Sequence, residues 1–238
     1  MHAVILAGGK GTRLRPYTTV FPKPLMPVGD IPILEVVIRQ LRAAGCTGVT
    51  MAVGHLAELL QAFFGDGSRW DLPISYVRED EPLGTVGALS LIPPFDAPFL
   101  LMNGDVLTTL DYAALMEHHR ASGGLATIAM HEREIKIDLG VIESDADGRI
   151  TNYIEKPTHR YHVSMGIYAF DPRIRDFIPY AQRLDFPDLV LKLLAAGEPV
   201  VSYPYRGYWL DIGRPDDYEQ AVGEFERLRG QFLPERPA

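Results

Sequence analysis

The chain has 238 residues, of which 47% are hydrophobic and 23% charged, and these are ordinary proportions for a globular protein. Its net charge of -8 argues against nucleic acid or an anionic membrane as its main partner. Cys46 is the only cysteine, which excludes an intrachain disulfide bond, and no apolar run reaches the length of a membrane span or a signal peptide. We therefore expect a cytoplasmic protein made of one large domain, with room for a subdomain.

Strands and helices alternate in the first half of the sequence. Apolar runs predict buried strands at 4–7, 49–53, 74–77 and 98–103, and apolar residues at helical spacing predict helices at 32–44, 56–64 and 111–121, with a short helix from 86. Such alternation indicates parallel β-α-β units, whose ligands bind beyond the carboxyl ends of the strands. We expect an α/β fold with a Rossmann-like, mostly parallel mixed sheet flanked by helices.

The pattern changes after residue 125. Short turns join the strands predicted at 125–130, 140–143, 150–154 and 165–170, and a helix at 185–196, a strand at 200–203 and a helix from 215 to about 229 follow. The short turns indicate antiparallel pairing. We expect this part to form a small subdomain over the sheet edge, where a second substrate would bind.

A glycine-rich turn follows the first predicted strand and opens a block of positive charge. Its glycines are Gly8, Gly9 and Gly11, and four basic residues precede the first acidic one, Asp30: these are Lys10, Arg13, Arg15 and Lys23. Glycine lets a ligand approach the main chain, whose N–H groups can bind an anion, and Arg and Lys suit phosphate oxygens. On an acidic chain this block indicates a bound diphosphate or triphosphate. The dinucleotide pattern fails at Leu14, and no Gly-Lys-Ser/Thr stands where a P-loop needs it.

Residues 8–25 resemble, at every fixed position, the G-G-x-G-T-R-L-x-P-x-T-x-x-x-P-K-P-L signature of the sugar-1-phosphate nucleotidyltransferases, or nucleoside-diphosphate-sugar pyrophosphorylases. Stretches that resemble further family motifs follow in order at 82–89, 103–105, 139–141, 155–157, 164–168 and 209–213, so the resemblance covers residues 3 to about 222. Leu139 replaces the usual tyrosine of one motif, and Ser164 and Met165 replace Asn and Ala in another; both departures fall in the implied sugar pocket. It looks closest to short bacterial guanylyltransferases and to the transferase domain of chains that also carry CBS domains. We expect neither CBS domains nor a C-terminal left-handed β-helix in this chain.

The resemblance implies a reaction in which a nucleoside triphosphate and a sugar-1-phosphate give a nucleoside-diphosphate sugar and pyrophosphate, with Mg²⁺ as cofactor. It implies one domain at 1–229, with a nucleotide-binding part at about 1–130 and a sugar-phosphate part at about 131–210, and a tail at 230–238. The implied nucleotide site comprises Leu6, Gly8, Gly9, Gly11, Thr12, Glu79, Gly84 and Thr85. The sugar-phosphate site comprises Gly140, Glu155, Lys156 and Gly166; Arg13 and Lys23 are the catalytic cations, and Asp105 and Asp211 the metal ligands.

Several alternatives stay open at the level of sequence. Glu79 favours GTP, because a carboxylate can accept from the amino edge of guanine, with a mannose-, heptose- or glucosamine-type 1-phosphate; yet it also fits a solvated acidic turn. Thymidylyl or uridylyl transfer to glucose-1-phosphate is the runner-up, and an inactive nucleotide-sugar-binding regulator is a more distant reading. A glycosyltransferase would show D-x-D where Asp105 stands in Gly-Asp-Val. The resemblance leaves a homo-oligomer open, and the sequence shows no interface signal for one.

Overall fold

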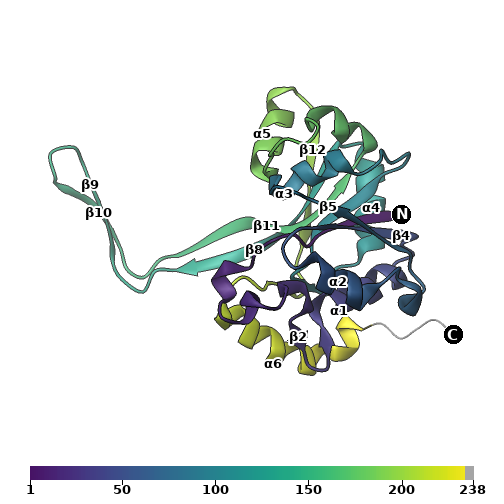
Figure 1. Cartoon of the computed structure of the whole chain (residues 1–238). Helices are drawn as coiled ribbons and strands as arrows, with labels where there is room; N and C mark the ends of the chain where they lie inside the picture. The colour runs from purple at the N-terminus through teal and green to yellow at the C-terminus, as the bar shows by residue number, and fades with distance from the viewer. Residues whose placement is uncertain (234–238) are drawn as a thin grey trace.

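A seven-stranded mixed sheet forms the centre of the molecule, in the order β12-β8-β11-β6-β1-β4-β5. A computed structural model describes residues 1–233 (Figure 1). Strand β11 runs antiparallel to both of its neighbours, β6 and β8, whereas the other neighbouring strands pair in parallel. Helices cover the sheet, which confirms the expected α/β architecture.

The elements agree closely with the predicted alternation. The sheet strands are β1 (His2–Leu6), β4 (Gly48–Val53), β5 (Ile74–Arg78), β6 (Phe99–Asn103), β8 (Ala126–Lys136), β11 (Thr158–Phe170) and β12 (Val200–Tyr205). The α-helices are α1 (Ile33–Ala43), α2 (Ala57–Phe64), α3 (Gly84–Gly87), α4 (Tyr112–Ser122), α5 (Phe186–Ala195) and α6 (Pro215–Phe232). Six 3-10 helices are η1 (Thr12–Leu14), η2 (Tyr17–Thr19), η3 (Lys23–Leu25), η4 (Ser68–Trp70), η5 (Ala88–Leu91) and η6 (Pro172–Phe177).

Three antiparallel strand pairs lie outside the main sheet. They are β2 (Pro27–Val28) with β3 (Ile31–Pro32), β7 (Val106–Thr108) with β13 (Trp209–Asp211), and β9 (Val141–Ser144) with β10 (Ile150–Ile154). The sequence pattern did not predict β7 and β13. Each has three residues, too few for a period to be recognised.

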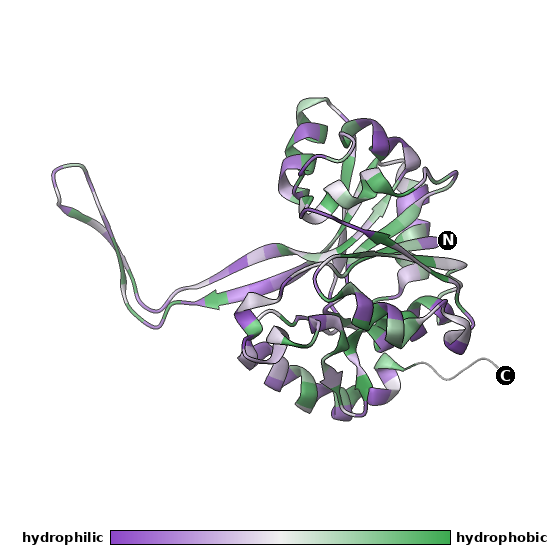
Figure 2. Cartoon of the chain, in the orientation of Figure 1, coloured by the Kyte–Doolittle hydropathy of each residue, from purple (hydrophilic) through white to green (hydrophobic). Residues whose placement is uncertain are grey.

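The sheet is buried on both faces. Along β1, Ala3 and Ile5 join one hydrophobic cluster, which includes residues of α1, α2 and α4, whereas Val4 joins a second cluster with residues of α5. Successive side chains of a strand point to opposite faces, so a strand covered on both sides must be apolar throughout. Figure 2 shows apolar residues concentrated in the strands at the centre of the body. None of the helices within residues 1–233 has the length and apolar character that crossing a membrane requires.

A third cluster holds α6 against the β7–β13 pair. Phe225 and Phe232 of α6 are fully buried, their rings stack with centroids 5.8 Å apart, and both belong to a cluster with Leu107 and Ile212. This burial carries α6 past the expected end near residue 229, to Phe232. The remainder of the expected tail, 234–238, lies outside the described residues. The packing of α6 fixes the position of β13, and with it the end of that strand.

Strands β8 and β11 continue past the sheet as a two-stranded arm, with the β9–β10 hairpin at its tip (Figure 1). Their ladder is unbroken from Thr158 to Ser164, and no residue from Glu132 to Ser164 is buried. The expected antiparallel pairing is confirmed, but its position differs from a subdomain over the sheet edge. The arm projects from the body because both strands are much longer than the predicted 125–130 and 165–170.

Candidate functional site

A deep pocket lies where the parallel strands end. A cavity of about 410 Å³ opens at the carboxyl ends of β1, β4, β5 and β6. It is lined by Leu6, Ala7, Gly8, Gly9, Gly11, Thr12, Arg13, Lys23, Pro24, Ala52, Glu79, Pro82, Gly84, Thr85, Asn103, Asp105 and Asp185. This is the edge at which α/β sheets bind ligands, because loops that follow several parallel strands converge there.

Two glycines allow the loop after β1 to pack tightly. A Cβ atom on Gly8 would lie 2.9 Å from Oε2 of Glu79 and 3.2 Å from the Gly54 nitrogen. Gly11 has a φ of +58°, and a Cβ there would lie 2.9 Å from Cγ2 of Thr18. Side chains at either position would force these neighbours apart. The main chain of the loop therefore stays accessible to a ligand, as an anion cradle requires.

A cation and a carboxylate meet at one end of the pocket. The Lys23 ammonium group pairs with Oδ2 of Asp105, and Lys23 is 8% exposed. Lys23 begins η3, and the Pro22 that precedes it has an extended conformation, so the backbone that presents the lysine is stiff. Oδ1 of Asp105 is buried and has no hydrogen-bond partner among residues 1–233. A buried carboxylate oxygen without a partner is costly unless a ligand completes it.

The pairing of β13 with β7 brings a second carboxylate to the same end. Asp211 pairs with Val106 across the two strands, and the Ile212 N–H donates to the carbonyl oxygen of Asp105 at 3.2 Å. Burial raises the pKa of the Asp211 carboxyl, and the negative charge of Asp105 raises it further, whereas Lys23 and Arg13 act in the opposite direction. The fold thus joins two aspartates that lie far apart in the sequence.

The two aspartates fit a hard divalent cation. Asp105 offers an oxygen without a partner, and Asp211 provides a second carboxylate whose ionised form a nearby positive charge would stabilise. No group of three or more His, Cys, Asp or Glu side chains suited to a metal occurs within the part of the chain that the structure describes. Asp105 and Asp211 would hold a Mg²⁺ ion here, which would neutralise charge on the phosphate oxygens of a ligand.

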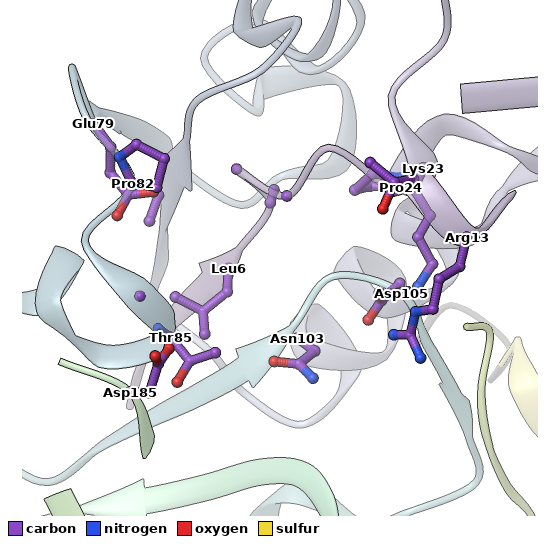
Figure 3. A pocket seen from close by; sticks show the side chains of 17 residues that line it. Leu6, Arg13, Lys23, Pro24, Glu79, Pro82, Thr85, Asn103, Asp105 and Asp185 are labelled. Carbon is purple, nitrogen blue, oxygen red and sulfur yellow. Dashed lines mark hydrogen bonds and ion pairs between the residues drawn. The ribbon is translucent and has the colours of Figure 1, made fainter. Parts of the chain in front are cut away.

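The opposite end of the pocket is formed by Glu79 and by the start of α3 (Figure 3). Oε1 of Glu79 accepts the Leu83 N–H at 3.2 Å, and burial raises the pKa of the Glu79 carboxyl. Thr85 donates its N–H to Oδ1 of Asp185 at 3.1 Å. Gly84 has a φ of +79°, and a Cβ there would lie 2.6 Å from the Leu184 carbonyl oxygen. A glycine is therefore required where this turn meets the segment before α5.

Most residues predicted for the site line this one pocket. They are Leu6, Gly8, Gly9, Gly11, Thr12, Arg13, Lys23, Glu79, Gly84, Thr85 and Asp105. Asp211 lies beside Asp105, as described above. Gly166 lies against the pocket-lining Asn103, because a Cβ on this glycine would come within 2.6 Å of the Asn103 side-chain nitrogen.

Three residues predicted for the sugar phosphate lie elsewhere, on the arm. Lys156 is exposed, and its ammonium group lies 3.9 Å from Oε1 of Glu155. The other carboxylate oxygen of Glu155, Oε2, accepts from the Tyr153 hydroxyl at 3.1 Å. A Cβ on Gly140 would lie 2.1 Å from the Tyr153 hydroxyl oxygen, so this glycine makes room for that ring. None of the three lines the pocket of its own chain.

Two polar residues of the pocket were missed by sequence reasoning. Asn103 ends β6 just before Asp105, and its position at the carboxyl end of a buried strand was a usable signal. Asp185 precedes α5 and was interpreted only as part of a helix start. Its contact with Thr85 spans 100 residues, so no local sequence pattern could predict that Asp185 lines the pocket.

The fold and pocket define an α/β protein that presents a glycine-rich loop, two cations and two neighbouring carboxylates at the edge of a parallel sheet. This arrangement suits a polyphosphate ligand and a divalent cation. The sequence profile of the family described as "Nucleotidyl transferase" matches residues 2–227, and the chain belongs to this family.

Curated relatives and solved structures agree with this assignment. A UTP–glucose-1-phosphate uridylyltransferase of Synechocystis is 36% identical over 93% of this chain and 62% of its own length. A mannose-1-phosphate guanylyltransferase of Mycobacterium tuberculosis is 33% identical over 95% of this chain and 65% of its own length. The chain thus spans just under two thirds of these relatives. The crystal structure of HddC from Yersinia pseudotuberculosis superposes with a TM-score of 0.71 at 25% identity, covering 94% of this chain and 99% of that one.

Proposed function

We propose that the protein is a sugar-1-phosphate nucleotidyltransferase, which converts a nucleoside triphosphate and a sugar-1-phosphate into a nucleoside-diphosphate sugar and pyrophosphate. The observation that carries this proposal is the carboxylate of Asp211 beside the Lys23–Asp105 pair, at the end of a pocket formed by a glycine loop. The printed names of both relatives describe nucleotidyl transfer involving a sugar-1-phosphate, which supports the same reaction class.

The reaction needs positioning and charge neutralisation more than acid–base chemistry. An oxygen of the sugar phosphate attacks the α-phosphorus, and the bond from that phosphorus to the bridging oxygen of the β-phosphate breaks, so that pyrophosphate leaves with the electron pair. The attacking oxygen is already anionic near neutral pH, so no general base is required. Arg13 would hold the leaving pyrophosphate, and Lys23 would face the α-phosphate. When held by Asp105 and Asp211, Mg²⁺ supplies further neutralisation of phosphate charge.

The two ends of the pocket suggest how a nucleotide would lie in it. Figure 3 shows Glu79 and Thr85 at one end, Arg13 and Lys23 at the other, and Leu6 between them. Phosphates would occupy the end with Arg13 and Lys23, where a cation held by Asp105 and Asp211 would offset the charge of those carboxylates; the other end has the carboxylate of Glu79 and no cation in the lining. The base would then lie near Glu79, and the apolar surface of Leu6 would contact the nucleoside between the two ends.

Guanine is the base that we favour. Burial raises the pKa of the Glu79 carboxyl, so hydrogen-bond donors on a ligand would stabilise its ionised form. The edge of guanine offers adjacent N–H donors to a carboxylate, whereas uracil and thymine offer one N–H between two carbonyl oxygens, which a carboxylate repels. GTP with a mannose-, heptose- or glucosamine-type 1-phosphate is therefore the proposed substrate pair, in accord with the name of the mycobacterial relative.

Uridylyl or thymidylyl transfer to glucose-1-phosphate is the second candidate. The observation that favours it is the 36% identity to the uridylyltransferase of Synechocystis, compared with 33% for the guanylyltransferase. A difference this small does not outweigh the chemistry of Glu79.

Pyrophosphate release across a substrate grid tests the proposal. GTP, UTP, dTTP, CTP and ATP are each combined with glucose-, mannose-, glucosamine-, N-acetylglucosamine- and heptose-1-phosphate in the presence of Mg²⁺. The folded Asp105→Ala variant, checked by circular dichroism, serves as the control. We expect release with GTP that the variant loses. Release with UTP or dTTP alone would select the second candidate, and nucleotide binding without release in any pair would instead support a regulator.

A further inference from the structure

The arm, defined as residues 131–163, exposes an unusual amount of apolar surface. Its exposed large apolar side chains are Ile135, Leu139, Ile142, Ile150, Tyr153, Ile154 and Tyr161, and Leu139 is 73% exposed. An isolated two-stranded hairpin is at best marginally stable in water, because it has no third element to cover its apolar side. The arm therefore calls for a partner surface.

Along the β8–β11 part of the arm, one face of the ribbon carries the exposed apolar side chains Ile135 and Tyr161, together with His159 and Arg133. His159 pairs with Ile135, and Tyr161 pairs with Arg133 two positions along, so these side chains share one face. The rings of His159 and Tyr161 lie 6.2 Å apart. The opposite face carries Glu134 and Arg160, which pair with each other across the strands at 2.8 Å. Glu134 and Arg160 compensate each other's charge, whereas Ile135 and Tyr161 are about half exposed and have no cover among residues 1–233.

The body of the same chain is poorly placed to cover this face. The arm leaves the sheet at the carboxyl edge and points away from the body (Figure 1). Bending it back would break the ladder that runs unbroken from Thr158 to Ser164. At roughly 3.3 Å per extended residue, the chain from Met130 to the turn near Asp145 can span up to about 50 Å. A body of roughly 200 residues has a radius of gyration of about 16 Å, so the arm reaches well beyond it.

A second copy of the chain offers a matching apolar surface beside the pocket. Tyr17, Val20 and Phe21 are large, exposed apolar residues on one short segment. That segment joins Arg13 to Lys23, which both line the phosphate end of the pocket. An arm that covers this segment therefore also reaches the mouth of the pocket.

The charges of the pocket call for the same partner. Its lining has two cations, Arg13 and Lys23, against three carboxylates, Glu79, Asp105 and Asp185. A Mg²⁺ ion at Asp105 would offset part of this negative charge, and a lysine from a second copy would supply a further cation beside the sugar phosphate. Lys156 lies on the arm, exposed, with Glu155 next to it, and neither reaches the pocket of its own chain.

We propose that each arm packs its Ile135–Tyr161 face on residues 17–21 of a second copy and places Glu155 and Lys156 at that copy's pocket. The sugar-phosphate site is then shared between the two chains of a two-fold dimer. Every chain carries both the arm and the receiving segment, as a symmetric interface requires. In such a dimer both arms and both receiving segments contribute to the interface. The proposed dimer does not depend on the proposed function, whereas the shared site rests on it.

Solution mass tests the interface. Light scattering of the wild-type protein is expected to give twice the chain mass of 26.5 kDa. Replacing Ile135 and Tyr161 together by serine removes apolar contacts from an exposed face, so the variant should fold and run as a monomer. The matched control replaces Glu134 and Arg160, on the polar face, by serine and should stay a dimer. A monomeric wild type, or equal behaviour of the two variants, would overturn the proposal.

Complementation between two inactive variants tests the shared site. One chain carries Lys23→Met, and the other carries Glu155→Ala with Lys156→Ala; the two are co-expressed with different tags and purified as the mixed dimer. Each variant alone should lose at least about 90% of its activity. In the mixed dimer one pocket is intact and receives an intact arm, so about half of wild-type activity should return.

The outcomes separate the interface from the reaction. An inactive mixed dimer means that the arm acts on its own pocket, and an active arm variant means that Glu155 and Lys156 have no role; either result overturns the shared site. Failure of wild-type protein to release pyrophosphate with any substrate pair overturns the proposed function and the shared site with it. The mass measurement still decides the dimer.

Discussion

Replacing Lys23 by methionine tests the assignment of the phosphate end most directly. Methionine keeps an unbranched side chain of similar length and removes the positive charge that pairs with Asp105. If Lys23 faces the α-phosphate, its loss resembles the loss of one preorganised donor to a developing negative charge. That change costs about 2.7–4 kcal/mol of transition-state stabilisation, so kcat/KM should fall about 100- to 1,000-fold.

The same substitution has a separate effect on stability, which the structure bounds. Removing one partner of a fully buried ion pair costs about 3–5 kcal/mol, because the other charge is left without compensation. The side chain of Asp105 is 23% exposed, so water recovers part of this loss. We therefore expect a decrease of about 1–3 kcal/mol in the free energy of unfolding. Adding Asp105→Asn should restore most of that stability and none of the activity.

Two assays separate these effects. Steady-state pyrophosphate release with the best substrate pair gives kcat/KM, and urea unfolding gives the stability of both single variants and the double variant. A kcat/KM for Lys23→Met within about threefold of wild type would refute a role for this lysine at the reacting phosphate. A double variant as unstable as Lys23→Met alone would refute the argument from the unpaired carboxylate.

Three further substitutions probe the rest of the pocket. Asp211→Asn should lower activity about tenfold or more and raise the Mg²⁺ concentration that gives the half-maximal rate. An unchanged Mg²⁺ titration would contradict the role of Asp211 as a metal ligand. Burial raises the pKa of the Glu79 carboxyl in the folded protein above its value in the unfolded chain. The stabilisation that the protonated carboxyl contributes is therefore complete below the unfolded-state pKa and is lost as the pH rises through the folded-state pKa. Glu79→Gln should thus stabilise the protein by about 0.5–1 kcal/mol at pH 7 and by nothing near pH 3, which thermal melts at both pH values check. The same variant should lower kcat/KM with GTP more than with UTP, which steady-state kinetics with each nucleotide check. Gly84→Ala should lower the free energy of unfolding, measured in urea, by about 1–3 kcal/mol because of the positive φ of Gly84. In the control Gly9→Ala, where an added Cβ meets no atom within 4 Å, the change should stay within about 0.5 kcal/mol. Equal losses of stability in the two variants would refute the strain argument.

Local sequence patterns determined the sheet, the helices and the glycine loop. The apolar runs at β1, β4 and β6 are nearly continuous because both faces of the sheet are covered, and a run of this kind is legible without any tertiary contact. The glycines before Arg13 are legible for the same reason, since backbone freedom is a property of each residue by itself. The family followed from these short stretches, and with it the identity of Lys23 and Asp105.

Tertiary structure decided which distant residues share the pocket and which leave it. Asp211 lies beside Asp105 because two three-residue strands pair under α6, and Asp185 reaches Thr85 across 100 residues. Neither contact has a local signature, because each depends on how several packed elements place two chain segments at once. The arm is the clearest case: alternation predicted its strands, but only their length and pairing set their direction. That direction carries Glu155 and Lys156 away from the pocket of their own chain.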